Sequence, residues 1–210
     1  MNEALPERHY PTRLIDRWTL ADGRSVIVRP VLPQDAELEQ SLVRELSPES
    51  RYQRFFNPLR ELTPAALDAM TRIDYRYHVA IVAESFAGGV ERVVGEARYV
   101  VDDDGAGGAE FALVVADDWR RVGLAGRLLC SLAAHARAAG LESLHGEVLA
   151  STQPMLALLR RLGFVRRMHP GDARLVRTSF ALHPRAGDGW LDPCAIAAAA
   201  RTAAATAAAP

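Results

Sequence analysis

Two acidic residues lie in apolar stretches of this sequence, where a carboxylate could exchange a proton with a reacting group. Glu110 is the one carboxylate at the start of the otherwise apolar run EFALVV, and Glu96 interrupts a second apolar run, VVGEARYV. We identify Glu110 as a candidate general base, because a positioned carboxylate can accept a proton in a transition state. Two simpler interpretations stay open: a strand-end residue that reaches solvent, and an ion-pair partner of a nearby arginine. For Glu96, the alternative is a residue on the solvent side of an alternating strand.

A basic turn with a glycine, RRVGLAG, follows the EFALVV run and precedes a leucine-rich helix. The first N–H groups of a helix have no partner inside it and lie at the positive end of the helix dipole, which suits a phosphate group. Gly123 has no side chain to hold a ligand away, and Arg120, Arg121 and Arg127 add positive charge. We therefore predict that a phosphate-bearing cofactor docks here. The simpler alternative is a tight turn without a ligand.

Other polar residues do not form a recognisable site. Asp117 and Asp118 would repel a phosphate, so we interpret them as loop or cap residues. His145 and Glu147 lie two apart on a predicted strand, but no nearby cysteine completes a set of metal ligands. No serine occupies the strand-to-helix elbow of a hydrolase. The segment RYQRFF could stack on nucleic acid, but at a net charge of −1 we expect its aromatic rings to face the core and its arginines to be solvated.

The elements that must position these residues follow from apolar periodicity and turn signals. We predict an α/β (α+β) single domain with one mixed, mostly antiparallel sheet flanked by helices. The helices before residue 78 should cover one face of the sheet and wall a cleft. In chain order we expect two strands around the turn at 21–24, helices over about 33–44, 47–56 and 63–73, strands from 78, 92 and 110, a helix over 124–139, a strand from 143, a helix over 154–162, and strands over 164–168 and 175–182.

The 210 residues, with 49% hydrophobic content, are enough for one domain with a core, and the net charge of −1 gives no overall attraction to nucleic acid or to an anionic membrane. We assign residues 1–16 to an N-terminal arm, 17–183 to the domain, and the alanine-rich residues 184–210 to a tail that is mobile or weakly helical. Cys130 should be buried and Cys194 lies in the tail, so no disulfide is expected. No signal peptide or membrane-spanning stretch is recognisable, so a cytoplasmic location is the default expectation.

The turn resembles the acetyl-coenzyme A motif of the GNAT superfamily of N-acetyltransferases, Q/R-x-x-G-x-G/A, which here reads RRVGLA. The preceding strand, Trp119, the leucine helix and the later string LLRRLGF are also similar to that family, so the resemblance covers roughly residues 17–183. It implies that acetyl-coenzyme A is the co-substrate and a primary amine the acceptor. Backbone N–H groups of the turn would hold the pyrophosphate, namely those of Val122, Gly123, Leu124, Ala125 and Gly126. The resemblance also implies that the pantetheine arm pairs with Leu113, Val114 and Val115, and that Thr152 and Met155 contact the cofactor.

More narrowly, the strings SPESRYQRFF, VVGEARYV and AEFALVV, and the segment around Asp74-Tyr75 with His78, are similar to the acetyltransferase domain of bacterial Pat-type protein lysine acetyltransferases. That resemblance places the base at Glu110, and Glu96 could lie across from it on a neighbouring strand and help to bind the amine. The base matters because a free lysine, with a pKa of about 10.4, is neutral in only about one molecule in 2,500 near pH 7. Pat-type proteins usually carry a second domain, cyclic-nucleotide-binding or acyl-CoA-synthetase-like, and neither fits within 210 residues. We therefore expect a catalytic domain standing alone.

Two positions depart from the family pattern. An asparagine often precedes the second motif's helix, where this chain has Thr152, and the position of a tyrosine acid is occupied by Leu159. A thiol has an ordinary pKa of about 8.5, so a thiolate can leave without that acid. Two other functions stay open: a GNAT enzyme that uses another acyl-CoA and a small amine, and a non-catalytic acyl-CoA-binding regulatory module.

Overall fold

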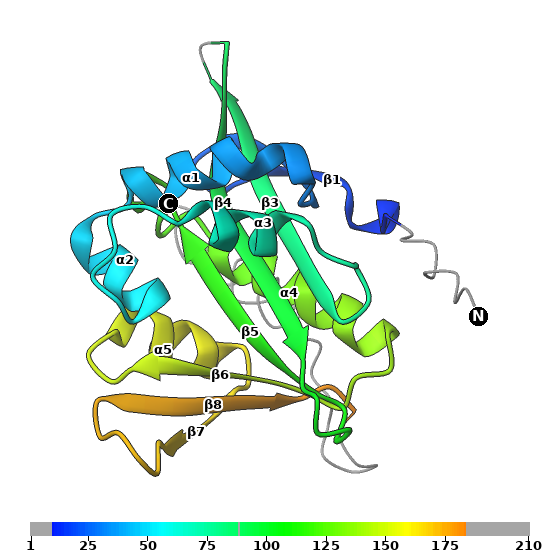
Figure 1. The fold of residues 1–210 in the computed structure, drawn as a ribbon, viewed down its shortest axis with the longest axis vertical. Helices are drawn as coiled ribbons and strands as arrows, with labels where there is room; N and C mark the ends of the chain where they lie inside the picture. The colour runs from blue at the N-terminus through cyan, green and yellow to red at the C-terminus, as the bar shows by residue number, and fades with distance from the viewer. Residues whose placement is uncertain (1–9, 88, 184–210) are drawn as a thin grey trace, which may run out of the picture.

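The computed structural model describes residues 10–87 and 89–183, which form an eight-stranded sheet with helices on both faces (Figure 1). The strand order is β1-β2-β3-β4-β5-β6-β8-β7. All neighbouring strands are antiparallel except β5 and β6, which are parallel. The predicted α/β (α+β) class is therefore confirmed. The strands are β1 (Asp16–Thr19), β2 (Ser25–Pro30), β3 (His78–Ala87), β4 (Val90–Val101), β5 (Gly108–Val115), β6 (Ser143–Leu149), β7 (Val165–Met168) and β8 (Leu175–Ala181).

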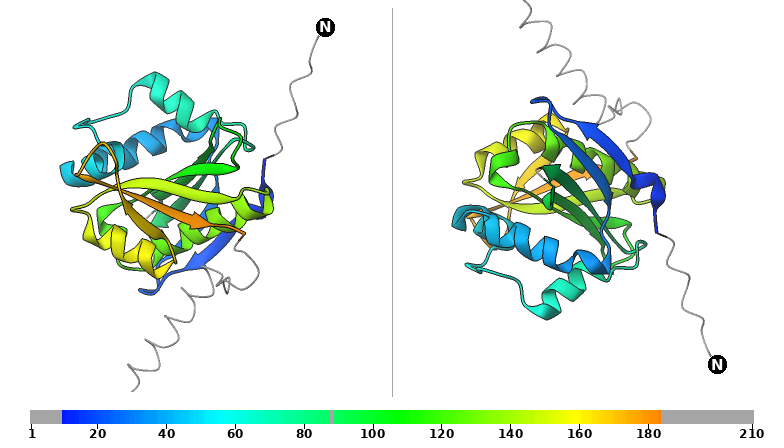
Figure 2. Two further views of the ribbon diagram at one scale, coloured as in Figure 1. Left: turned by 90° about the horizontal axis from the view of Figure 1, so that it is seen from below. Right: turned by 90° about the horizontal axis from the view of Figure 1, so that it is seen from above.

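The helices divide between the two faces of the sheet, as the end-on views show (Figure 2). One face carries the three helices that precede β3, and the other carries the two later helices. Each predicted helix is present, with its ends shifted by a few residues at most. The helices are α1 (Ala36–Glu45), α2 (Pro48–Phe55), α3 (Pro64–Thr71), α4 (Leu124–Ala138) and α5 (Gln153–Arg161).

The core lies on both faces of the central strands. In β3 the consecutive residues from Val79 to Ala83 are all buried, because α1 and α3 cover one side of this part of the sheet and α4 covers the other. The predicted leucine face of α4 is confirmed, since Leu124, Leu128 and Leu132 are buried against the sheet. Gly95 in β4 allows α4 to pack closely, because a Cβ at Gly95 would lie 3.1 Å from Leu128.

Helix α2 corrects one prediction about the segment RYQRFF. Its N-terminus is capped by the hydroxyl of Ser47, which accepts a hydrogen bond from the Ser50 N–H. The aromatic side chains of Tyr52 and Phe56 are exposed, whereas Arg54 points inward. The expected core face of aromatics with solvated arginines is therefore wrong, and the reason is a buried carboxylate beneath the helix that a guanidinium must neutralise.

Residues 1–9, Gly88 between β3 and β4, and the tail from residue 184 with Cys194 lie outside the described residues. Within the described part, Leu14 is buried and Arg13 lies 3.0 Å from His135 of α4. Cys130 is buried, as predicted. None of the helices in the described chain is long and apolar enough to cross a membrane.

Candidate active site

Strands β5 and β6 pair at one end only, and this opening is the main feature of the site. The parallel register joins Gly108–Glu110 to Ser143–His145 and goes no further. Gly146 allows this close approach, because a Cβ there would lie 2.9 Å from the ring of Phe111. Beyond this point β6 pairs only with β8 and β5 only with β4, and the two strands diverge toward their C-terminal ends (Figure 1). The β5 edge from Phe111 to Val115 therefore faces the opening without a paired strand in the described chain.

The glycine turn lies at the open, diverging end of β5 and leads directly into α4. Gly123 is the N-cap of α4 and has φ 88°, a left-handed conformation that favours glycine, and Arg121 also has a positive φ of 64°. The first hydrogen bond inside the helix runs from the Arg127 N–H to the Gly123 carbonyl at 3.2 Å. The N–H groups of Leu124, Ala125 and Gly126 precede that bond and have no partner within the helix. A Cβ at Gly123 would meet no atom within 4 Å, so the space above the turn is open to a ligand.

The two aspartates before the turn are loop and cap residues, as predicted. Asp117 accepts hydrogen bonds of 2.7 Å from both the Ser47 N–H and the Ser50 hydroxyl at the start of α2. Burial acts to raise the pKa of Asp117, but these hydrogen bonds outweigh burial and hold it below its usual value. Arg120 donates to the Ser50 hydroxyl at 2.7 Å and lies 2.9 Å from Asp117, so its guanidinium also fastens the turn to α2.

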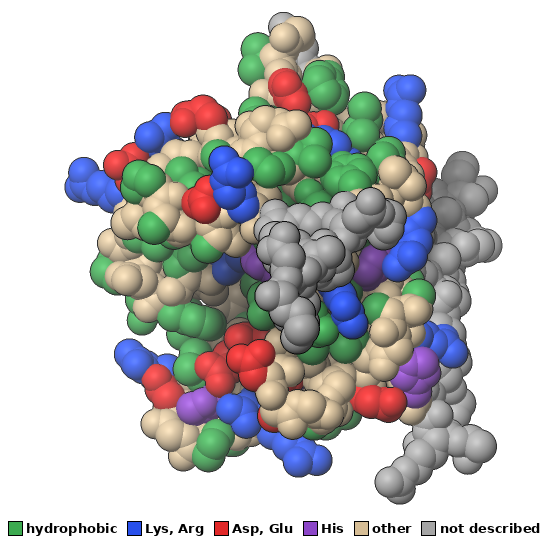
Figure 3. Space-filling model, turned by 45° about the vertical axis from the view of Figure 1, so that its right-hand side comes forward, with side chains coloured by type: hydrophobic (Ala, Val, Ile, Leu, Met, Phe, Trp, Pro, Cys, Tyr) green, Lys and Arg blue, Asp and Glu red, His purple; other side chains and the backbone are tan. Residues whose placement is uncertain are grey.

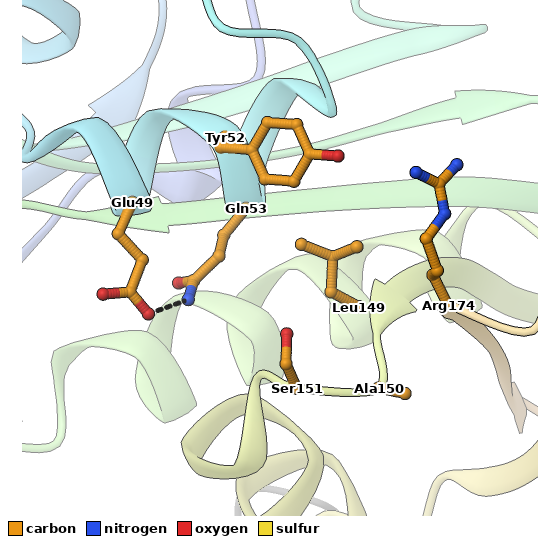
Figure 4. A pocket seen from close by; sticks show the side chains of 7 residues that line it. All are labelled: Glu49, Tyr52, Gln53, Leu149, Ala150, Ser151 and Arg174. Carbon is orange, nitrogen blue, oxygen red and sulfur yellow. Dashed lines mark hydrogen bonds between the residues drawn. The ribbon is translucent and has the colours of Figure 1, made fainter.

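A cavity of about 400 Å³ lies between α2 and the C-terminal end of β6, on the open side of the divergence (Figure 4). Tyr52 and Gln53 reach it from α2, and Leu149 and Ser151 from the end of β6. The complete lining is Glu49, Tyr52, Gln53, Leu149, Ala150, Ser151 and Arg174. Sequence reasoning did not select these residues, because Tyr52 was expected to face the core and the others carry no motif.

Thr152, at the start of α5, has a polar atom in need of a partner. Its hydroxyl oxygen is buried and has no hydrogen-bond partner among the described residues, and it does not cap α5 although Thr152 is the N-cap residue. Met155 is partly buried against the core. Leu159 is 1% exposed, so this position supplies packing and no acid. The helix ends at Arg161, Gly163 follows its C-cap with φ 85°, and Phe164 stacks on Phe180 with ring centroids 5.2 Å apart.

Glu110 stands where β5 and β6 part, and its side chain is exposed. It pairs with Val100 of β4 on one side and with His145 of β6 on the other. Glu96 pairs with Val114, which is four residues further along β5. The two glutamates therefore share a face of the sheet but are separated by about 13 Å along the strands. The prediction that Glu96 could lie across from Glu110 is wrong, because the register of the β4–β5 hairpin offsets them.

Glu96 is fully buried and neutralised by two guanidinium groups. It accepts a hydrogen bond from Arg98 of the same strand, and its second oxygen lies 3.3 Å from Arg54 of α2. Burial acts to raise the pKa of Glu96, but the two arginines outweigh burial and lower it. Glu96 is thus not the solvent-side residue of the alternative interpretation, and an amine has no surface path to it.

Two further titratable groups belong to the same buried network. Glu39 of α1 is 1% exposed, and burial together with the negative charge of Glu96 raises its pKa to about 8. Arg98 lies 3.0 Å from the Nε2 atom of His78, and burial together with this guanidinium lowers the pKa of His78 to about 4. At neutral pH Glu39 is therefore largely protonated and His78 is neutral. Within the part of the chain that the structure describes, no group of histidine, cysteine and acidic residues could hold a metal ion.

The remaining predicted site residues surround the opening. Leu113, Val114 and Val115 are nearly buried in the diverging half of β5. Val122 is partly buried, and its carbonyl accepts a bond from the Ala21 N–H at 3.5 Å. The strand, turn and helix therefore bring the predicted cofactor residues to one end of the opening and Glu110 to the other.

The sequence is similar to known acetyltransferases over most of its length. An acetyltransferase of Pseudomonas aeruginosa is 36% identical over 169 residues, which is 80% of this chain and 90% of that protein. Acetyltransferase Pat of Mycolicibacterium smegmatis is 32% identical over 143 residues, 68% of this chain but only 42% of that protein.

Solved structures show the same arrangement. The GNAT domain of PAT from S. lividans superposes with a TM-score of 0.75 at 29% identity, covering 82% of this chain and 99% of that domain. This likeness confirms the resemblance to the Pat-type domain. The Salmonella typhimurium protein yncA, solved with its cofactor acetyl-CoA, superposes with a TM-score of 0.61 at 17% identity and shares the fold, over 79% of this chain and 99% of that one.

The sequence model of the acetyltransferase (GNAT) family matches residues 40–164. That range contains both glutamates, the opening between β5 and β6, the glycine turn, and Phe164 after α5. It is more than half of the 210-residue chain. This chain therefore belongs to the acetyltransferase (GNAT) family.

Proposed function

We propose that this protein transfers an acetyl group from acetyl-CoA to a primary amine, and that the acceptor is a lysine side chain of a protein. One observation carries the proposal: β5 and β6 part at Glu110, and the helix N-terminus with its free N–H groups lies at the other end of the opening. A carboxylate for the amine and a receptor for the phosphates thus lie at the two ends of one strand.

The residues around the opening fit acetyl-CoA. The N–H groups of Leu124, Ala125 and Gly126 point at the space above Gly123, where a pyrophosphate would accept their hydrogen bonds. The unpaired edge of β5 suits the amide-containing arm of the cofactor, which can bond to it like an added strand. The buried, unpartnered hydroxyl of Thr152 offers a further bond at the end of α5 nearest the opening. When bound, the cofactor supplies an acetyl thioester for attack by the amine.

Glu110 would act on the acceptor amine. Because a lysine amine is almost entirely protonated near pH 7, its neutral form costs about 4.6 kcal/mol, and a positioned base is worth about 10²–10⁴-fold in rate. Glu110 is exposed at the start of the opening, so it can accept that proton directly or through a water molecule. Glu96 would contribute indirectly, because its pairing with Arg54 holds α2 beside the cavity.

A cationic acceptor agrees with the charges near Glu110. The Asp102 carboxylate lies beside Gly108, two residues before Glu110 on the same strand. The space-filling view also shows a group of acidic side chains on the lower part of the face that it presents, whereas the arginines are dispersed (Figure 3). Negative potential at this position attracts a lysine ammonium group.

The decisive experiment measures release of free thiol from acetyl-CoA in the presence of small amines and candidate acceptor proteins. We expect release with at least one lysine-bearing protein, and mass spectrometry should find that lysine acetylated. Release only with small amines would replace the protein acceptor by a small molecule. Tight binding of acetyl-CoA without release to any acceptor would support the binding-module alternative instead.

A further inference from the structure

A histidine–aspartate pair lies beside Glu110, and its histidine, His145, has no part in the function proposed above. Glu110 and His145 are partners in the parallel register of β5 and β6. Paired residues on adjacent strands, about 4.8 Å apart, direct their side chains to the same face of the sheet. This is the last pair before the two strands part, so His145 and Glu110 flank the same end of the opening.

Asp102 fixes the protonation pattern of the His145 ring. The Nε2 atom of His145 lies 2.8 Å from one carboxylate oxygen of Asp102 and 3.1 Å from the other. An ionised carboxylate can only accept hydrogen bonds, so Nε2 carries the proton and donates it. In the neutral ring the lone pair is then on Nδ1, for which the described residues provide no hydrogen-bond partner. The side chains of His145 and Asp102 are 32% and 27% exposed. The imidazole ring that carries Nδ1 is therefore held in one orientation by Asp102 and is still accessible to solvent.

The backbone makes room for this pair. A side chain at Gly108 would overlap the Asp102 carboxylate, so the aspartate can cross this strand only because residue 108 is glycine. The Asp102 N–H also donates to the Gly108 carbonyl at 3.0 Å, which holds the loop against the strand. Gly108 lies two residues before Glu110 and so belongs to the same face. Asp102, His145 and Glu110 therefore converge on one face at one end of the opening.

The proton balance of acetyl transfer calls for a second acceptor. An ammonium nitrogen begins with three protons and ends, as an amide nitrogen, with one. One proton leaves before the nitrogen attacks, and the other leaves after the carbon–nitrogen bond forms, as the carbon–sulfur bond breaks. A single carboxylate can hold only one of these protons at a time.

We propose that His145, held by Asp102, accepts the second of these protons on Nδ1 and passes it to the departing coenzyme A thiolate. This inference rests on the proposed function, since it needs an amine acceptor. A thiol has an ordinary pKa of about 8.5 and a free imidazole one of about 6.5, so transfer from an imidazolium to a thiolate is favourable. The buried Leu159 cannot supply that proton, and among the described residues at the junction only His145 has an imidazole.

The test compares His145→Gln with His169→Gln in the thiol-release assay. His169 is a matched control, because its Nε2 atom lies 3.0 Å from the Glu147 carboxylate in a similar pair away from the junction. We expect His145→Gln to lower kcat by about 10²-fold, with unchanged acetyl-CoA affinity by calorimetry and an unchanged melting temperature. His169→Gln should stay within twofold of the wild type. Added imidazole should restore part of the activity of His145→Ala, which a purely structural role of the ring does not predict.

A wild-type kcat in His145→Gln, or no recovery of His145→Ala with imidazole, would overturn the inference and leave the proposed function intact. If the wild type itself releases no thiol with any acceptor, the proposed function fails instead. Nitrogen NMR of the His145 ring tests the geometry without any reaction. We expect the Nε2–H form in the intact protein and its loss in Asp102→Asn, and finding the Nδ1–H form in the intact protein would overturn the inference.

Discussion

Arg54 of helix α2 lies 3.3 Å from the carboxylate of Glu96, which has no exposed surface in strand β4. The pair joins the helix that lines the cavity to the strand beside β5. Arg98 makes the second contact with the same carboxylate, so each partner in this network neutralises another. Removing one member leaves a buried charge without its partner, which is more costly than the loss of an exposed ion pair.

Glu96→Ala should therefore destabilise the protein by about 3–5 kcal/mol, measured by urea denaturation. The matched control is Glu61→Ala, which breaks the exposed pair of Glu61 with Arg44 and should cost less than about 1 kcal/mol. Equal losses of unfolding free energy in the two variants would mean that the buried network contributes no more to stability than an exposed ion pair.

This network also shows why the site could be predicted only in part. The strand, the turn and helix α4 follow from nearby residues, because an apolar run, a glycine and leucines four apart each favour a local structure. The inward position of Arg54 depends on a charge that lies more than 40 residues away in the sequence, at Glu96. A pattern of charged residues in a short helix cannot report such a partner.

The relation between Glu96 and Glu110 is a second example. The sequence places both carboxylates on apolar strands, but their separation depends on the register of the β4–β5 hairpin. The loop DDDGAGG is rich in turn residues and does not specify one register. The pairing of Asp102 with His145 was missed for the same reason, because it requires the parallel register of β5 with β6.

Glu110→Gln should lower the turnover of acetyl transfer by about 10²-fold or more and leave the affinity for acetyl-CoA nearly unchanged. The amide has nearly the same size but cannot take up the amine proton, and the exposed position of Glu110 means that little packing is lost. Thiol release and calorimetry measure the two quantities, with Glu61→Gln as a control at an exposed glutamate in an ion pair away from the opening. Unchanged turnover would remove Glu110 as the base.

Thr152→Val should leave stability unchanged or slightly higher and weaken acetyl-CoA binding. The hydroxyl is buried and has no partner within the described chain, so replacing it by a methyl group removes an unsatisfied polar atom. We expect the dissociation constant to rise by about 2- to 10-fold, because a lost hydrogen bond is worth about 0.5–1.5 kcal/mol. Thr178→Val is the contrasting variant: its buried hydroxyl donates to the Gly146 carbonyl at 3.0 Å, so it should lose stability. An equal affinity in Thr152→Val would remove this hydroxyl from the cofactor site.

Acid should destabilise the fold through two histidines. Burial lowers the pKa of both His78 and His135 from 6.5 to about 4, with Arg98 and Arg13 respectively adding to the effect. Between pH 6.5 and 4 the unfolded chain therefore binds protons that the folded chain does not. Their contribution to stability is full above pH 6.5 and is lost as the pH falls toward 4. Denaturation curves at a series of pH values should show this slope, and His135→Gln should make it shallower; an identical slope in that variant would exclude His135 as a contributor.

Gly123→Val should weaken acetyl-CoA binding by at least 10-fold, because its side chain would occupy the space above the first N–H groups of α4 where the pyrophosphate is proposed to lie. The variant also forces a branched residue to adopt φ 88°, which destabilises the turn regardless of any ligand.

The control variant Gly140→Val separates the loss of ligand binding from the strain in the backbone. Gly140 follows the other end of the same helix with φ 82°, and a Cβ there also meets no atom within 4 Å. Both variants should lower the melting temperature by a similar amount, whereas calorimetry should show weaker acetyl-CoA binding only for Gly123→Val. Equal affinities in the two variants would show that the turn does not hold the phosphates.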